Sequence, residues 1–428
     1  MIGTEPALAG RYALVRRQTE ALADGLSEAD AQVQSMPDAS PVKWHLAHTT
    51  WFFETFVLEQ AEHAFRPFHP AYRVLFNSYY NGIGEQHPRP QRGLVTRPSL
   101  AEVLQWRRQV DERVQAVLAR GADAALRGRI ELGLQHEQQH QELILTDLLH
   151  LLSCNPLEPA YRPAPAPGPR PDAGPLSFEA HAGGVAEIGH AGEGFAFDNE
   201  SPRHRVFLEP FAIATRLVNC GEWLEFIADG GYAEARWWLS AGWDAVRRQA
   251  IEAPLYWRRS GGATFTHRFG LHGRVPLDPA QPVAHVSLYE ADAFARWWSA
   301  QHPGHAPLQL PTEAQWEHVA AAHEARARSE GRFLESGRFE PADAAEAAPR
   351  QLMGQLWQWT VSAYQAYPGF VAWEGAVGEY NAKFMVDQYV LRGGSFATPR
   401  GHIRASYRNF FPSGTRWQFS GVRLVHAP

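Results

Sequence analysis

The chain has 428 residues, of which 45% are hydrophobic and 12% aromatic, and this length allows two or three domains with sizeable cores. Its formal net charge is -6 and it contains no basic run, which argues against a nucleic-acid or polyanionic membrane partner. Two cysteines in different regions, no N-terminal signal pattern and no apolar run of about 18 residues argue against a disulfide framework and a membrane span, so we expect a cytoplasmic protein.

The N-terminal region has helical periodicity in four segments, which predicts a four-helix bundle with a long crossover. The predicted helices span residues 7–31, 42–62, 96–120 and 130–152. Ser40 is placed as an N-cap, and Pro41 as the first residue of the second helix. That helix carries His45 and His48 among aromatic side chains, whose packing would fix the histidine rotamers.

Residues 63–98 interrupt the helical pattern. This segment is too aromatic for a disordered linker and too rich in glycine and proline for a helix. Loops of this length inside a compact domain are usually functional, so we expect the adjacent Tyr79 and Tyr80 to lie in an ordered, functional loop.

The fourth predicted helix carries His136 and His140, which are four residues apart and therefore share a face. Two such imidazoles can hold one metal ion when a third ligand comes from elsewhere, and His45 or His48 is the candidate. Solvent-facing histidines and hydrogen-bonded core histidines are the alternatives. The sequence His136-Glu137-x-x-His140 also matches the zinc-protease pattern, so a zinc metalloprotease or hydrolase is the first rival.

A proline-rich segment at residues 162–171 predicts an extended linker. We therefore expect a helical domain at 1–160, a linker at 161–175 and a second domain at 176–428. In the second domain the sequence predicts two helices, at 219–228 and 288–301, and strands at 186–189, 204–208 and 283–286. These elements, with many Trp and Gly residues in turns, indicate an α+β domain stabilised by aromatic packing.

Two sets of motifs carry a resemblance over nearly the whole chain. The first comprises Trp44 to Glu54 and the HxxxHxE run at His136, His140 and Glu142. The second comprises Pro311 to Glu317, Gly378 to Asn381, Leu391 to Ser395, Tyr407 to Phe411 and Gly421 to Leu424. The chain thereby resembles the ergothioneine-biosynthesis sulfoxide synthases and the related selenoneine synthases. This resemblance implies a two-domain α+β fold: a DinB-like four-helix bundle and a formylglycine-generating-enzyme-like domain of C-type-lectin type.

The resemblance implies an Fe(II) site at His48, His136 and His140, with His48 rather than His45 as the third ligand. Three neutral imidazoles on one face leave about half of an octahedral coordination sphere open. Dioxygen and a sulfur or selenium donor can then bind side by side, next to the imidazole of hercynine. Glu142 is then outer support for the ligands.

Further matches concern hercynine. Gln139 matches a residue that contacts the hercynine imidazole, and Asn409 and Phe410 match the segment that closes over the same substrate. The adjacent Phe411 is also expected to bind substrate. An aromatic side chain there suits the trimethylammonium group, with a cation–π attraction of about 0.5–2 kcal/mol. For Phe410 taken alone, core packing is the alternative.

Oxygen activation beside a thiolate tends to oxidise the chalcogen itself, so such an enzyme needs a source of protons and electrons at the iron. In the branch that this loop resembles, a tyrosine pair is the active-site feature, and we predict that Tyr79 or Tyr80 is the catalytic donor. A structural tyrosine pair is the alternative. Arg89 and Arg92 are candidates to bind the carboxylate of an amino-acid donor.

The chain also departs from the family pattern. Formylglycine-generating enzymes use cysteines in this domain, where the chain has only Cys220, so aldehyde formation on a protein cysteine is not expected. Phe411 and Thr415-Arg416 stand where users of γ-glutamylcysteine have an acidic residue and an arginine, which disfavours that donor. A selenosugar or a cysteine-type thiol remains as the expected donor. A non-catalytic lectin-like binding module is the second rival function.

Overall fold

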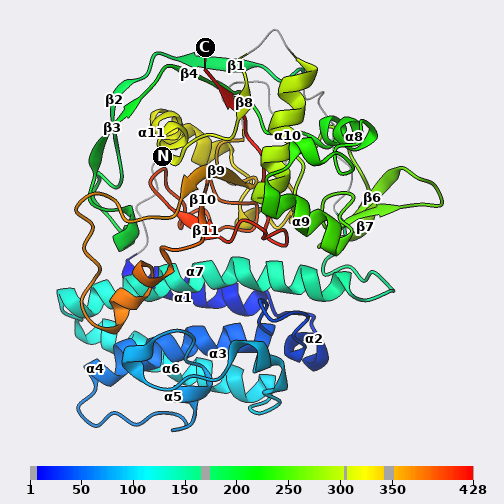
Figure 1. Cartoon of the computed structure of the whole chain (residues 1–428). Coiled ribbons are helices and arrows are strands. Elements are labelled where there is room, and N and C mark those ends of the chain that lie inside the picture. Colours follow the sequence, from blue (N-terminus) through cyan, green and yellow to red (C-terminus); the bar gives the residue numbers. More distant parts are fainter. Residues whose placement is uncertain (1–6, 165–173, 303–305, 342–350, 428) are drawn as a thin grey trace. The chain divides into compact units, whose positions relative to one another are not determined.

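The computed structural model describes residues 7–164, 174–302, 306–341 and 351–427 (Figure 1). The chain divides into two compact units: unit 1 comprises Met1–Cys154 and Trp373–Tyr380, and unit 2 comprises Asn155–Ala372 and Asn381–Pro428. Most of the predicted linker, residues 165–173, lies outside the described residues. Within the described ranges, no helix has both the length and the apolar character needed to cross a membrane.

Unit 1 is a helical bundle, as the sequence predicts. Its helices are α1 (Leu8–Ala21), α2 (Glu28–Gln32), α3 (Val42–Phe53), α4 (Glu59–Ala61), α5 (Tyr72–Leu75), α6 (Leu100–Arg120) and α7 (Ala124–Ser153). The long helices α1, α3, α6 and α7 lie side by side, and α1 and α3 each pack against both α6 and α7 (Figure 1). A π-helical turn at Glu54–Leu58 joins α3 to α4.

The predicted first helix, 7–31, is wrong in its second half. Helix α1 ends at Ala21, and Gly25 adopts a φ of 81°, a left-handed conformation that ends a helix at little cost for glycine. Helix α2 then begins after Ser27, whose hydroxyl accepts the backbone N–H of Asp30.

The predicted N-cap at Ser40 is also wrong. Pro41 is the residue that precedes α3, and no side chain of its own caps the helix. The Ser40 hydroxyl instead accepts a hydrogen bond of 2.9 Å from Arg92 Nη1, and the Ser40 backbone N–H donates to Asp147 Oδ2 at 2.7 Å. Ser40 is thus engaged by two residues from distant elements and does not cap α3.

A buried ion network holds the bundle together. Glu137 on α7 is fully buried and accepts hydrogen bonds from Arg16 on α1, at 2.8 Å, and from Arg107 on α6. Arg16 also binds Asp111 at 2.6 Å. Burial by itself would raise the pKa of Glu137, but the two guanidinium groups outweigh it and lower this pKa to about 2.

We expect Glu137→Gln to lower the free energy of unfolding by about 3–5 kcal/mol, because it takes from two buried guanidiniums the carboxylate that they share. Urea unfolding measures this loss. Because the pKa of Glu137 lies at about 2, below its ordinary 4.5, the difference between wild type and variant should be full above pH 4.5 and shrink as the pH falls toward 2. The control Glu131→Gln, in a half-buried pair with Arg11, should cost no more than about 1 kcal/mol. An equal effect of both substitutions would contradict the expectation.

Unit 2 combines helices with short strands, as the α+β prediction requires. The helices are α8 (Cys220–Ala228), α9 (Ser240–Gln249), α10 (Leu288–Gln301) and α11 (Glu313–Glu330). The strands are β1 (Phe178–His181), β2 (Gly184–Ile188), β3 (His204–Leu208), β4 (Phe211–Ala214), β5 (Trp257–Arg259), β6 (Phe265–Gly270), β7 (Gly273–Pro276), β8 (Leu308–Gln309), β9 (Trp357–Ala363), β10 (Tyr389–Arg392), β11 (Asn409–Phe411), β12 (Ser420–Gly421) and β13 (Val425–His426).

The strands form two four-stranded sheets, ordered β1-β4-β13-β8 and β11-β10-β9-β12, together with the β2-β3 pair and the three-stranded β5-β6-β7 sheet. Pairing is antiparallel throughout these sheets except between β12 and β9. Helices α10 and α11 pack against the β9 strand, so the second four-stranded sheet lies at the core of unit 2 (Figure 1).

Two of the predictions for unit 2 need correction. The sequence predicts two helices, but α9 and α11 are present as well; α11 begins inside the Pro311 to Glu317 motif, after the N-cap Thr312. The strand predicted at 283–286 is absent, because His285 adopts a φ of 65° and bends the chain. The helix predicted at 288–301 is confirmed as α10.

Three of the C-terminal motifs, Pro311 to Glu317, Leu391 to Ser395 and Tyr407 to Phe411, meet in one buried ion cluster. Arg392 donates to Glu313 and to Glu317, each at 2.9 Å, and Arg408 donates to Glu313 at 2.9 and 3.0 Å. These residues come from α11, from β10 and from the segment before β11. The ion pairs thus connect these three motifs within unit 2, and Arg408 directly precedes β11.

Candidate metal centre

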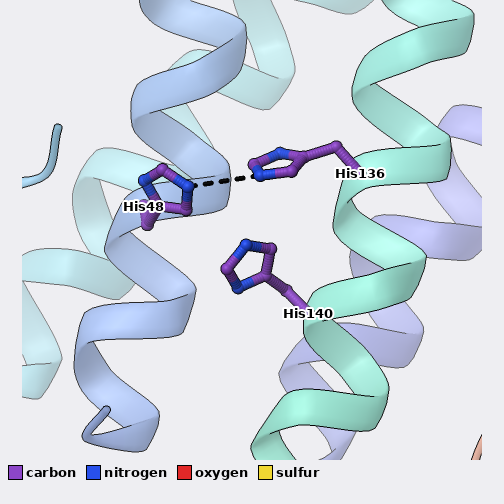
Figure 2. Close-up of side chains that lie close together, drawn as sticks. All are labelled: His48, His136 and His140. Carbon is purple, nitrogen blue, oxygen red and sulfur yellow. Dashed lines mark hydrogen bonds between the residues drawn. The ribbon is translucent and has the colours of Figure 1, made fainter. Parts of the chain in front are cut away.

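Three buried histidines converge inside unit 1 (Figure 2). His48 comes from α3, whereas His136 and His140 come from successive turns of α7, and one ring nitrogen of each lies within 4.8 Å of the others. The Nε2 atoms of His48 and His136 are 3.2 Å apart. Two nitrogens bound to one ion at about 2.1 Å and at right angles would lie about 3.0 Å apart, so this spacing fits shared coordination.

The surroundings prepare these histidines for a metal. His48 Nδ1 donates to the Phe76 carbonyl at 2.6 Å, which leaves the lone pair on Nε2. The His48 ring is stacked between Trp44, at 4.6 Å, and Trp51, at 5.4 Å. Burial lowers the pKa of His48 and His140 well below the ordinary value, and that of His136 to about 3. Neutral imidazoles, the form that binds metals, are therefore available.

The structure places His48, and not His45, among the three. His45 and His48 share a face of α3. The His45 ring, however, forms a hydrogen bond with His140, with 2.8 Å between the two Nδ1 atoms. Its other nitrogen, Nε2, lies 3.0 Å from Asp147.

Glu137 does not face the three histidines. The zinc-protease pattern requires this glutamate to activate a metal-bound water, but its carboxylate is held by Arg16 and Arg107 within the bundle. The metalloprotease interpretation thus lacks its general base. Glu142 is buried on the same helix, and its role as outer support stays a prediction.

Tyr79 and Tyr80 stack on each other in the loop after α5, with ring centroids 4.7 Å apart. Burial raises the pKa of both hydroxyls above the ordinary value, so both are protonated at neutral pH. The Tyr80 ring lies 5.6 Å from that of Trp51, which in turn stacks on His48. Trp51 thus contacts both Tyr80 and His48, and Phe52 contacts both Tyr80 and His136.

A third tyrosine, Tyr380, is a site residue that the sequence analysis missed. Its hydroxyl donates to Gln139 Oε1, and its ring lies 5.7 Å from His136 and 6.1 Å from Tyr79. Tyr380 is 241 residues away from Gln139 in sequence, so no local pattern connects them. In the sequence, Tyr380 lies within the motif Gly378 to Asn381, which could have indicated this residue. The motif was instead assigned to the fold of the C-terminal domain.

The neighbouring Glu379 anchors this segment to the tyrosine loop. Its carboxylate accepts the backbone N–H groups of Asn81, at 3.0 Å, and Gly82, at 2.6 Å. This two-point contact connects the segment that carries Tyr380 to the loop that carries Tyr79.

The two predicted arginines differ in their surroundings. Arg92 is buried, lies 3.4 Å from the Trp44 ring centroid and donates to Ser40 and Ser78 at 2.9 and 3.0 Å. Its Nε has no hydrogen-bond partner within the described ranges, and burial and the charge of Arg89 lower its pKa to about 9. Arg89 is exposed and donates to the Asp38 carbonyl.

Asn409, Phe410 and Phe411 form β11 in unit 2, where Val390 of β10 pairs with Phe410. The Phe410 ring stacks on Tyr364 at 4.0 Å, and each of the three residues is partly exposed. Their contact with substrate stays a prediction.

Comparison with known proteins assigns both parts of the chain. Residues 11–144 match the DinB superfamily, and residues 179–428 match the sulfatase-modifying factor enzyme 1-like domain. The chain is 33% identical to the hercynine oxygenase of Mycobacterium tuberculosis over 98% of each chain. It is 32% identical to that of Mycolicibacterium thermoresistibile, over 96% of this chain and 92% of the relative. Ergothioneine biosynthesis protein 1 of Schizosaccharomyces pombe is 26% identical over 54% of this chain and 27% of its own length.

Proposed function

The chain belongs to the hercynine oxygenase family, and we propose that it is a nonheme Fe(II)- and dioxygen-dependent oxidoreductase that joins sulfur or selenium to C2 of the hercynine imidazole. The observation that carries this proposal is the convergence of His48, His136 and His140 in a buried site, in a chain whose relatives match it over nearly its full length. The overall change balances when the C2–H and chalcogen–H bonds break, the carbon–chalcogen bond forms, one oxygen atom adds to the chalcogen and the other leaves as water.

The donor set fits iron. His48, His136 and His140 would hold it, and when bound it would supply dioxygen activation with about half of its coordination sphere open to reactants. The remaining tasks fall to protein groups around the three histidines. They must orient the hercynine ring, hold a proton for the reacting oxygen and exclude water, and the burial of the histidines supports the last of these.

Gln139 and Tyr380 are suited to the first two tasks. The Gln139 amide can bind the hercynine imidazole, and the Tyr380 hydroxyl, which donates to Gln139 Oε1, holds a proton beside the same group. Tyr380 packs directly on His136, whereas the Tyr80 ring contacts Trp51, which in turn stacks on His48. This geometry favours Tyr380 as the proton donor. Tyr79 lies edge-on to the Tyr380 ring and stacks on Tyr80.

The donor is a cysteine-type thiol or a selenosugar. Arg92 donates to the hydroxyls of Ser40 and Ser78, and its Nε has no hydrogen-bond partner among the described residues, which supports binding of an anionic group such as a donor carboxylate. Arg416, in the terminal loop, is held by Glu290 at 2.8 and 2.9 Å, so it is not free to bind the donor of γ-glutamylcysteine users.

Reconstitution tests the proposal. Metal-free protein is loaded anaerobically with Fe(II) and mixed in air with hercynine and either cysteine, γ-glutamylcysteine or a selenosugar. We expect a new carbon–chalcogen product by mass spectrometry that requires both Fe(II) and dioxygen, with Zn(II)-loaded protein as the matched control. Absence of product from all three donors would overturn the proposal, and peptide cleavage by the Zn(II) form would revive the metalloprotease interpretation.

A further inference from the structure

We propose that His45 and Asp147 form a hydrogen-bonded relay that fixes the tautomer of His140 and strengthens it as a metal ligand, although neither residue contacts the metal. Asp147 lies seven residues after His140 on α7, so the two side chains share a face, and His45 of α3 fits between them. The inference rests on the proposed metal site, but not on the identity of the reaction.

The proton positions follow from donor and acceptor chemistry. Asp147 Oδ2 lies 3.0 Å from His45 Nε2 and also accepts the Ser40 backbone N–H, so this oxygen acts as an acceptor and His45 Nε2 carries the proton. In the neutral ring the His45 Nδ1 is then an acceptor. It lies 2.8 Å from His140 Nδ1, so the hydrogen between the two rings belongs to His140.

This arrangement leaves the lone pair of His140 on Nε2. Figure 2 shows the ring nitrogen of His140 that is not used by His45 turned toward His48 and His136. The relay therefore runs from the carboxylate through two imidazoles to the centre where the three histidines converge. A carboxylate behind a ligating histidine raises the basicity of that ligand and holds its ring in place.

Burial and an additional hydrogen bond hold His45 and Asp147 in this arrangement. His45 and Asp147 are 2% and 6% exposed, so water does not compete for their hydrogen bonds. Asp147 Oδ2 also accepts the Ser40 backbone N–H at 2.7 Å, which fixes the carboxylate at the start of α3.

The three histidines differ in the hydrogen-bond partner of their Nδ1 atoms. His48 Nδ1 donates to a neutral carbonyl, that of Phe76, and His136 Nδ1 has no hydrogen-bond partner within the described ranges. His140 has a chain that ends in a carboxylate. His140 should thus be the strongest donor of the set, and negative charge behind it should favour the oxidised metal.

Three variants separate the links of the relay. Asp147→Asn keeps an acceptor for His45 and for Ser40 but removes the charge. His45→Asn keeps an acceptor near His140 but is too short to reach Asp147, and His45→Phe removes both links. His150→Asn, on the same helix but hydrogen-bonded to Ser35, is the matched control.

The readouts are the Fe(II) dissociation constant from chelator competition, the Fe(III)/Fe(II) reduction potential and the visible spectrum of the Co(II) form. We expect Asp147→Asn and His45→Phe to weaken Fe(II) binding about 10–100-fold and to raise the potential, with His45→Asn in between and His150→Asn unchanged. Wild-type affinity, potential and Co(II) spectrum in Asp147→Asn and His45→Phe would overturn the relay, and so would a loss of thermal stability without any change in these three. If the shifts occur but no donor yields product, the proposed reaction fails while the relay stands.

Discussion

Replacing His136 by alanine should lower Fe(II) affinity by at least about 100-fold and abolish the carbon–chalcogen product. The substitution removes one of three nitrogens that converge within 4.8 Å, and the two that remain, on different helices, cannot hold the ion at the same strength. Iron content after anaerobic loading and desalting measures the first effect, and mass spectrometry of the reaction mixture measures the second.

Two further proteins complete this experiment. His136→Gln keeps most of the side-chain volume beside Phe52 and Tyr380, so it separates the loss of a ligand from the loss of packing. His63→Ala removes an exposed histidine of unit 1 and should bind iron as the wild type does. Full iron occupancy of His136→Ala would show that the metal lies elsewhere.

Replacing Tyr380 by phenylalanine should slow product formation by about 10²–10⁴-fold with iron binding unchanged, which is the usual contribution of a positioned proton donor. Only the hydroxyl that donates to Gln139 is lost, and the ring contacts with His136 and Tyr79 remain possible. Single-turnover rates with Fe(II)-loaded protein measure the effect.

The matched variants are Tyr79→Phe and Tyr80→Phe, which test the donor that the sequence analysis predicted. If Tyr380 is the donor, each of these should slow the reaction less than Tyr380→Phe does. A larger loss in Tyr79→Phe or Tyr80→Phe, with Tyr380→Phe at the wild-type rate, would return the role to the loop tyrosines.

Helical periodicity predicted much of unit 1, because it records which residues of one segment share a face. It placed His136 and His140 together, and it placed His45 and His48 on one side of α3. Periodicity did not distinguish His45 from His48, since residues three apart lie on the same face of a helix. The difference lies in distant partners, the Phe76 carbonyl for His48 and Asp147 for His45.

The errors have the same origin. Ser40 has the residue type of an N-cap, but Arg92 and Asp147 engage it from other segments. Val283 to Val286 has the composition of a strand, but the left-handed conformation of His285 ends the pairing. The spacing of residues in the sequence could not reveal Tyr380. This residue meets Gln139 only because residues Trp373–Tyr380, from the second half of the chain, pack in unit 1.

The position of residues Trp373–Tyr380 in unit 1 makes the two halves of the chain depend on each other. Residues Trp373–Tyr380 fall within the span that matches the sulfatase-modifying factor domain, yet they belong to the compact unit built by the DinB-like helices. A gene split near residue 155 would leave one product with all three histidines and the other with Tyr380. The two halves of the chain therefore share one compact unit, and each half would lack part of that unit if it were produced alone.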